Sequence, residues 1–120
     1  MTGTLYERLG GYEGITRLVD DVMANHLKNP LIKTRFEASR DLDHAKRMAV
    51  DFFAAGSGGD VEYKGKNMLD AHRGMNISEQ EYMAAIDDIL AAIDSHGIDG
   101  ATRTEVLGIL YSLKEEIIRV

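Results

Sequence analysis

A histidine beyond the middle of the chain has the type and surroundings best suited to metal chemistry. His72 follows Met68 and Leu69 by about one helical turn, and Gly74, a common helix terminator, comes soon after it. Its imidazole can therefore lie on the inward side of a short helix expected at about residues 66–73. A neutral imidazole is a good metal ligand, but on this pattern alone a hydrogen-bonded core or surface histidine is the more common case.

The other polar residues give little support for a different kind of active site. The chain has no cysteine, which excludes thiolate nucleophiles, disulfides and cysteine-bound metals. No serine stands in a nucleophile elbow with a histidine partner, which argues against a hydrolase. The glycine-rich residues 56–60 follow a helix and lack the lysine and hydroxyl of a phosphate loop. Asp87 and Asp88 diverge by about 100° on a helix, so we interpret them as solvated charges.

Length and charge limit the class of protein and its partners. A chain of 120 residues with 44% hydrophobic residues can bury one core, so a single domain spanning residues 1–120 is expected. The formal net charge of -6 argues against a nucleic-acid partner. The N-terminus lacks the pattern of a signal peptide, and no apolar run approaches the ~20 residues that would span a bilayer. A cytoplasmic protein is therefore expected.

Apolar residues at helical spacing predict an all-α fold. The first long helix is expected between Tyr12 and Leu27, and Pro30 marks the end of that region. A second is expected at about residues 41–55, where the glycine-rich segment stops it. The inward-facing residues are Ile15, Leu18, Val19, Val22, Met23 and Leu27 in the first helix, and Leu42, Ala45, Met48, Ala49, Phe52 and Phe53 in the second.

Two capping signatures divide the C-terminal part of the chain. Ser78 and Glu81 have the spacing of a capping box and open a long helix that is expected to close at Gly97. Thr102 and Glu105 repeat this spacing, so a last helix is expected to begin there and to run to the end of the chain. No segment shows the sustained alternation of a strand.

Four stretches together resemble the truncated haemoglobins, and most closely their first, N-type group (group I). They are LYERLGG at residues 5–11, FEA at 36–38, the glycine pair at 58–59 and YKGKNMLDAH at 63–72. The last is the most specific, because it follows the family pattern Tyr-x-Gly-basic-x-Met-x-x-Ala-His in order and spacing. The resemblance covers nearly the whole chain. It implies a truncated globin fold, a two-over-two helical sandwich with a vestigial first helix and an extended loop before the proximal helix.

The same resemblance implies haem b as the cofactor, with His72 as the proximal ligand of its iron. Phe36 matches the aromatic residue that wedges against the porphyrin. The other matched positions are Met68 in the proximal motif, Phe52 and Phe53 on the distal side, and Lys46 and Lys66 at basic positions that can meet haem propionates. A solvated surface charge is an equally good interpretation of each lysine.

The distal side departs from the pattern that the resemblance implies. Group members usually carry a tyrosine on the second helix, with glutamine or histidine on the next, to donate a hydrogen bond to bound dioxygen. The matching second-helix position is Met23. One register of the next helix puts Ala45, Met48 and Ala49 on the distal face, and a second register is shifted by about two residues. Neither supplies a central donor, and such a donor contributes roughly 1.5–3 kcal/mol. Oxygen storage and NO dioxygenation are therefore disfavoured.

Three distal arrangements stay open, and we favour an apolar pocket that prefers CO or NO. The others are a sixth iron ligand from Met48, Lys46 or His44, and a donor such as Arg47. The leading hypothesis is a haem protein that binds a diatomic gas (O2, NO or CO), with oxygen transport or redox turnover with a reductase as extensions. The alternatives are electron transfer or redox sensing by a six-coordinate haem, and a haem-free sensor or interaction module.

Overall fold

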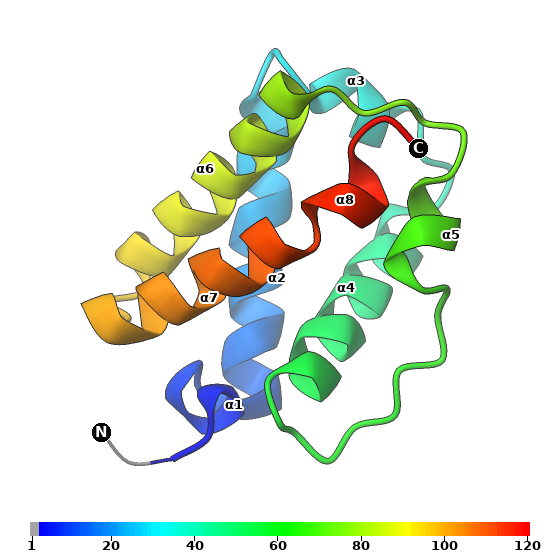
Figure 1. The fold of residues 1–120 in the computed structure, drawn as a ribbon. Helices are drawn as coiled ribbons and strands as arrows, with labels where there is room; N and C mark the ends of the chain where they lie inside the picture. Colours follow the sequence, from blue (N-terminus) through cyan, green and yellow to red (C-terminus); the bar gives the residue numbers. More distant parts are fainter. Residues whose placement is uncertain (1–2) are drawn as a thin grey trace.

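The computed structural model describes residues 3–120. The expected domain spans residues 1–120, so its first two residues, Met1 and Thr2, lie outside the described part. The described residues form an all-α fold, as predicted (Figure 1). Its helices are α1 (Leu5–Arg8), α2 (Gly11–Lys28), α3 (Lys33–Glu37), α4 (Leu42–Gly56), α5 (Met68–His72), α6 (Glu79–Ser95), α7 (Gly100–Ser112) and α8 (Lys114–Ile117). Within this part of the chain, no helix is long and apolar enough to cross a membrane.

Two pairs of long helices form the body of the molecule. Helix α2 contacts α4 on one side and α6 on another, and α6 in turn packs against α7 (Figure 1). The apolar stripe predicted for α2 is buried from Ile15 to Met23, and it shares the core with Ile86 and Ile93 of α6. Full burial of such side chains contributes roughly 1.5–3 kcal/mol each, so these contacts fix how α2 crosses α6.

The buried side of α4 differs from the predicted one. Val50 and Ala54 are the fully buried residues of this helix and belong to the core. The residues predicted to face inward, Leu42, Ala45, Met48, Ala49, Phe52 and Phe53, are only half-buried. Helix α4 packs mainly on α2. Its fully buried residues are therefore Val50 and Ala54, and the other apolar residues of the helix stay partly exposed.

The predicted starts of α4 and α6 are confirmed by their caps. Asp41 accepts a hydrogen bond from the backbone of His44 at 3.0 Å and opens α4. At α6 the Ser78 hydroxyl accepts from the Glu81 backbone at 3.0 Å, while the Glu81 carboxylate accepts from the Ser78 backbone at 3.1 Å. This reciprocal pair is the predicted capping box.

The predicted start and end of the last helix are wrong. Helix α7 begins at Gly100, so Thr102 lies inside its first turn and is fully buried, where its hydroxyl accepts a hydrogen bond from Arg8 at 3.1 Å. The chain does not end as one helix either, because α7 stops at Ser112, α8 follows, and Ile118 has an extended backbone. The Thr102 hydroxyl, which the sequence pattern predicted to cap the helix, instead accepts a hydrogen bond from Arg8 of α1.

Replacing Ser78 by alanine is expected to lower the free energy of unfolding by about 1 kcal/mol, because two backbone N–H groups lose or loosen their capping partners. Thr104→Ala is the matched control. Thr104 is exposed inside α7, so its change should stay within about 0.5 kcal/mol. Urea unfolding of the two variants measures both values, and equal effects would contradict a capping role for Ser78.

Candidate functional site

The side chain of His72 is oriented by its own helix. The carboxamide of Asn67 caps α5 by accepting from the Asp70 backbone at 2.8 Å. One turn later, His72 Nδ1 lies 2.8 Å from the carbonyl oxygen of Met68. A carbonyl can only accept, so Nδ1 carries a proton, and in the neutral imidazole the lone pair then lies on Nε2. A histidine held in this tautomer presents Nε2 as a metal ligand.

The C-terminus holds the segment that follows His72. The backbone N–H groups of Gly74 and Asn76 donate to the carbonyl of Val120 at 3.2 Å and 3.1 Å. Ile77 forms a parallel bridge with Ile118, next to the core. The short helix α5 therefore depends on the extended end of the chain for its position, and α5 and α8 lie side by side (Figure 1).

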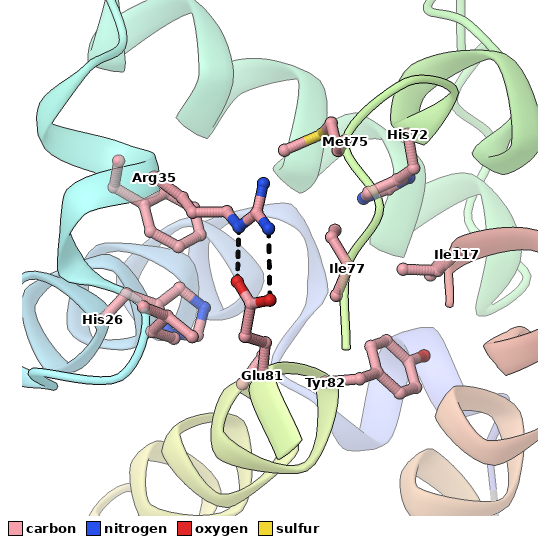
Figure 2. Close-up of a pocket in the computed structure, with 11 residues that line it drawn as sticks. His26, Arg35, His72, Met75, Ile77, Glu81, Tyr82 and Ile117 are labelled. Atoms are coloured by element: carbon pink, nitrogen blue, oxygen red, sulfur yellow. Dashed lines mark hydrogen bonds and ion pairs between the residues drawn. The ribbon is translucent and has the colours of Figure 1, made fainter. Parts of the chain in front are cut away.

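His72 opens onto a cavity of about 240 Å³ between α2, α3, α5, α6 and α8 (Figure 2). Apolar and aromatic side chains make up most of its wall, and a few charged and imidazole groups join them. The lining residues are His26, Ile32, Arg35, Phe36, His72, Met75, Ile77, Glu81, Tyr82, Ala85 and Ile117. Phe36 and His72, which the sequence predicted for one site, thus share one cavity although they are far apart in the chain.

A buried polar network supports Phe36 from behind. The ring of His26 stacks on Phe36 with centroids 4.8 Å apart, and His26 Nδ1 donates to the Asp88 carboxylate at 2.8 Å. Asn29 donates to the same carboxylate at 3.2 Å, and Asn25 donates to the Asp88 backbone carbonyl at 3.1 Å. Burial lowers the pKa of His26 below its usual value, and Asp88 opposes this shift. The network ties the end of α2 to α6.

The sequence interpretation missed His26 and misassigned Asp88. We interpreted Asp88 as a solvated charge, but its side chain is only 15% exposed and accepts hydrogen bonds from α2. The helical spacing carried a signal for His26, which follows Met23 by three residues and Val22 by four on the buried stripe. The pairing with Asp88, 62 positions later, had no local signal.

A second charged pair stands in the cavity wall. Arg35 of α3 forms a two-pronged ion pair with Glu81 of α6: Nε donates to one carboxylate oxygen, and Nη2 donates to the other at 3.1 Å (Figure 2). The Arg35 guanidinium, together with hydrogen bonds from Ser78, holds the pKa of Glu81 down at about 2. Both groups therefore stay charged at neutral pH.

The basic residues predicted to meet the cofactor lie away from the wall of this cavity. Lys46 pairs with Asp20 at 3.4 Å and lines a separate open hollow between α2 and α4. Lys66 is exposed, and its backbone carbonyl accepts from the Tyr63 hydroxyl at 2.6 Å. The Tyr63 ring crosses over Gly65, where a Cβ would lie 2.4 Å from the phenol oxygen, which explains the glycine of the Tyr-x-Gly-basic motif.

The remaining predicted residues are distributed over the helices. Met68 is half-buried against the core and supplies the carbonyl that orients His72. Met23 is buried on α2, and Met48 is half-buried on α4. Phe52 and Phe53 line a different apolar cavity of about 90 Å³, together with residues of α1 and α7. Among residues 3–120, no group of three or more His, Asp or Glu side chains could hold a metal ion, so His72 would act as a single ligand.

Comparison with known proteins places this arrangement in a family. A family model described as bacterial-like globin matches residues 4–119, and the chain belongs to this family. Within it, the group 1 truncated hemoglobin of Tetrahymena pyriformis is 30% identical over 115 residues, covering 96% of this chain and 94% of that protein. The group 1 truncated hemoglobin GlbN of a Synechocystis strain is 30% identical over 112 residues, covering 88% of each. The resemblance to group I truncated haemoglobins is thus confirmed.

Solved structures confirm the two-over-two sandwich. The crystal structure of the Tetrahymena pyriformis truncated hemoglobin in its Fe(III) form superposes with a TM-score of 0.93, at 29% identity, covering 98% of this chain and 100% of that one. The group II truncated hemoglobin of Bacillus anthracis has a TM-score of 0.88 at 24% identity and shows only that the fold is shared.

The residues of the cavity fit the group that globins carry. Globins hold haem iron on one proximal imidazole nitrogen, and His72 offers Nε2 inside a wall that contains Phe36, Ile32 and Ile117. The cavity of about 240 Å³ is smaller than ordinary ligand pockets, which range over roughly 300–1,000 Å³. A porphyrin would need more room than this volume, and the short helices α3 and α5 both contribute residues to the wall.

Proposed function

We propose that this chain binds haem b on His72 and binds a diatomic gas. The observation that carries the proposal is the hydrogen bond from His72 Nδ1 to the Met68 carbonyl, because it leaves Nε2 as a lone-pair donor in a largely apolar cavity. Family membership assigns haem iron as the cofactor. Haem supplies an iron with one face left for the gas when a single protein side chain binds the other.

The protein's own part is to orient the imidazole, hold the porphyrin and exclude water. Phe36, backed by His26, gives an aromatic surface, and the isoleucines of the wall give it a largely apolar lining. An apolar surrounding limits access of water to the iron and so slows its oxidation. These are properties of a carrier or sensor of gas, and they are the properties that the geometry supports best.

We propose further that the distal side is apolar and prefers CO or NO over O2. Met23 is buried on α2, and Ala45, Met48 and Ala49 are half-buried on α4. Two polar side chains of α2 and α4 have partners of their own: the Tyr12 hydroxyl donates to Asp51 at 2.7 Å, and Lys46 pairs with Asp20. Bound dioxygen carries partial negative charge and is stabilised by a donor, whereas CO needs none.

Met23→Tyr tests this preference by adding the missing donor. The variant is expected to bind O2 about tenfold more tightly or better, since a charge-assisted hydrogen bond contributes roughly 1.5–3 kcal/mol and 1.4 kcal/mol is tenfold. CO affinity should change by less than about threefold. Met23→Leu is the control for the change of side chain. Tight, slowly released O2 in the wild type would overturn the apolar proposal.

The visible spectra of the ferric, ferrous and ferrous-plus-CO forms test haem binding itself. A Soret band that shifts with CO, from a five-coordinate ferrous form, is the expected result. A low-spin ferrous spectrum before CO would instead indicate an internal sixth ligand, such as Met48, Lys46 or His44, and would favour electron transfer. A wild type that takes up no haem would leave only the haem-free module.

A further inference from the structure

A guanidinium group stands in the wall of the cavity that contains His72. Arg35 of α3 lines this cavity, and its side chain is 30% exposed. Among the lining residues, Glu81, with which it pairs, is the other carboxylate or guanidinium, and His26 and His72 contribute two imidazoles. Most of the remaining wall is apolar, so the guanidinium is a strong local feature for any anionic part of a ligand.

The ion pair with Glu81 orients Arg35 without using all of its donors. Nε and Nη2 point to the two carboxylate oxygens, and Figure 2 shows the third nitrogen, Nη1, directed away from Glu81. Glu81 is itself fixed, because its carboxylate also accepts from the Ser78 backbone in the capping box. A guanidinium has five N–H donors in one plane, so a group held on one edge presents another edge in a set direction.

Neither lysine that the family resemblance assigned to a carboxylate is comparable. Lys46 pairs with Asp20 on the α2–α4 side, and Lys66 is exposed on the loop before α5. Arg35 alone among these three cations lines the cavity, and an arginine fixed by a two-pronged ion pair loses less side-chain freedom on binding than a mobile lysine.

We propose that Arg35 binds a propionate carboxylate of the porphyrin through Nη1, with Glu81 as the group that orients it. This inference rests on the proposed function, because the ligand is the haem of the same site. It assigns the carboxylate end of the porphyrin to the α3 side of the cavity. Glu81 acts as a positioning residue, because it orients the guanidinium through the two-pronged ion pair.

A comparison of haem with haem dimethyl ester separates the effect of the propionate charges from the effect of packing around the ring. In the ester both propionates lack charge, while the ring and the iron are unchanged. The measurement is the rate at which each porphyrin leaves the ferric holoprotein for an excess of a haem-scavenging apoglobin. Arg35→Met should lose haem about tenfold faster than the wild type, a modest value because water partly screens the group. The same variant should lose the ester at the wild-type rate.

Three further variants complete the test. Lys33→Met removes an exposed cation from the same helix and should leave both rates within about twofold of the wild type. Arg35→Lys keeps the charge and should recover part of the difference between haem and its ester. Glu81→Gln weakens the orienting pair and should speed the loss of haem more than the loss of the ester.

Other outcomes would overturn the inference. If Arg35→Met speeds the loss of haem and ester equally, the residue only joins α3 to α6. If Lys66→Met shows the ester-dependent effect and Arg35→Met does not, the carboxylate lies on the loop before α5. A wild type that holds haem while Arg35→Met changes nothing defeats this inference alone, whereas a wild type that binds no haem defeats the proposed function as well.

Discussion

Replacing His72 by alanine is expected to leave the chain folded but unable to hold haem iron. The side chain is half-buried, and its hydrogen bond to the Met68 carbonyl is a single neutral one, so the free energy of unfolding should fall by about 1 kcal/mol or less. Loss of groups that merely support a metal ligand costs roughly 10–100-fold in affinity, so loss of the ligand itself should exceed about 100-fold. Haem titration followed at the Soret band measures this.

Two companion variants make the result specific to the ligand. His96→Ala is the matched control, because His96 is also half-buried but pairs with Asp21 at 2.6 Å and does not line the cavity. Its haem affinity should equal that of the wild type. His72→Gly with added imidazole should regain a five-coordinate spectrum, since free imidazole can supply the missing nitrogen. An unchanged spectrum in His72→Ala would show that another residue binds the iron.

The family resemblance predicted that His72 and Phe36 belong to one site, and the structure places both in the wall of one cavity. The motif could not show that the His72 tautomer is fixed by Met68, but its helical spacing of four residues makes that contact natural. The ion pair between Arg35 and Glu81 spans 46 positions and joins two helices, and no local pattern predicts such a contact. Residues whose roles depend on partners far away in the sequence can be identified only from the tertiary structure.

The same distinction explains the fold. Helices α2, α4 and α6 are long enough for their apolar spacing to be visible in the sequence, and their caps are local. Helices α1 and α3 have only four and five residues, which is too short for a periodic pattern to emerge. The start of α7 was mispredicted because burial of Thr102 against Arg8 prevailed over a valid capping pattern.

Asp88→Ala is expected to lower the free energy of unfolding by about 2–4 kcal/mol. The substitution leaves the buried Nδ1–H of His26 and the carboxamide of Asn29 without their acceptor, and a buried polar group that loses its partner costs more than the bond itself. Asn25 keeps its bond, which goes to the backbone. Asp87→Ala is the matched control, since that neighbouring carboxylate is exposed, and should stay within about 0.5 kcal/mol. Equal losses in urea unfolding would contradict the network.

The pH dependence of unfolding isolates His26 within this network. Burial lowers its pKa in the folded chain, so between that value and about 6.5 the unfolded chain binds more protons. Stability is therefore complete above about pH 6.5 and falls as the pH drops below it. Glu81 has a pKa of about 2 in the folded chain, below its ordinary value of 4.5. Its contribution to the free energy of unfolding is therefore lost only as the pH falls below about 4.5, outside the range in which His26 titrates. Between about pH 5 and 8, His26→Leu should thus show a flatter stability profile than the wild type. Parallel profiles would mean that His26 is not the buried titrating group.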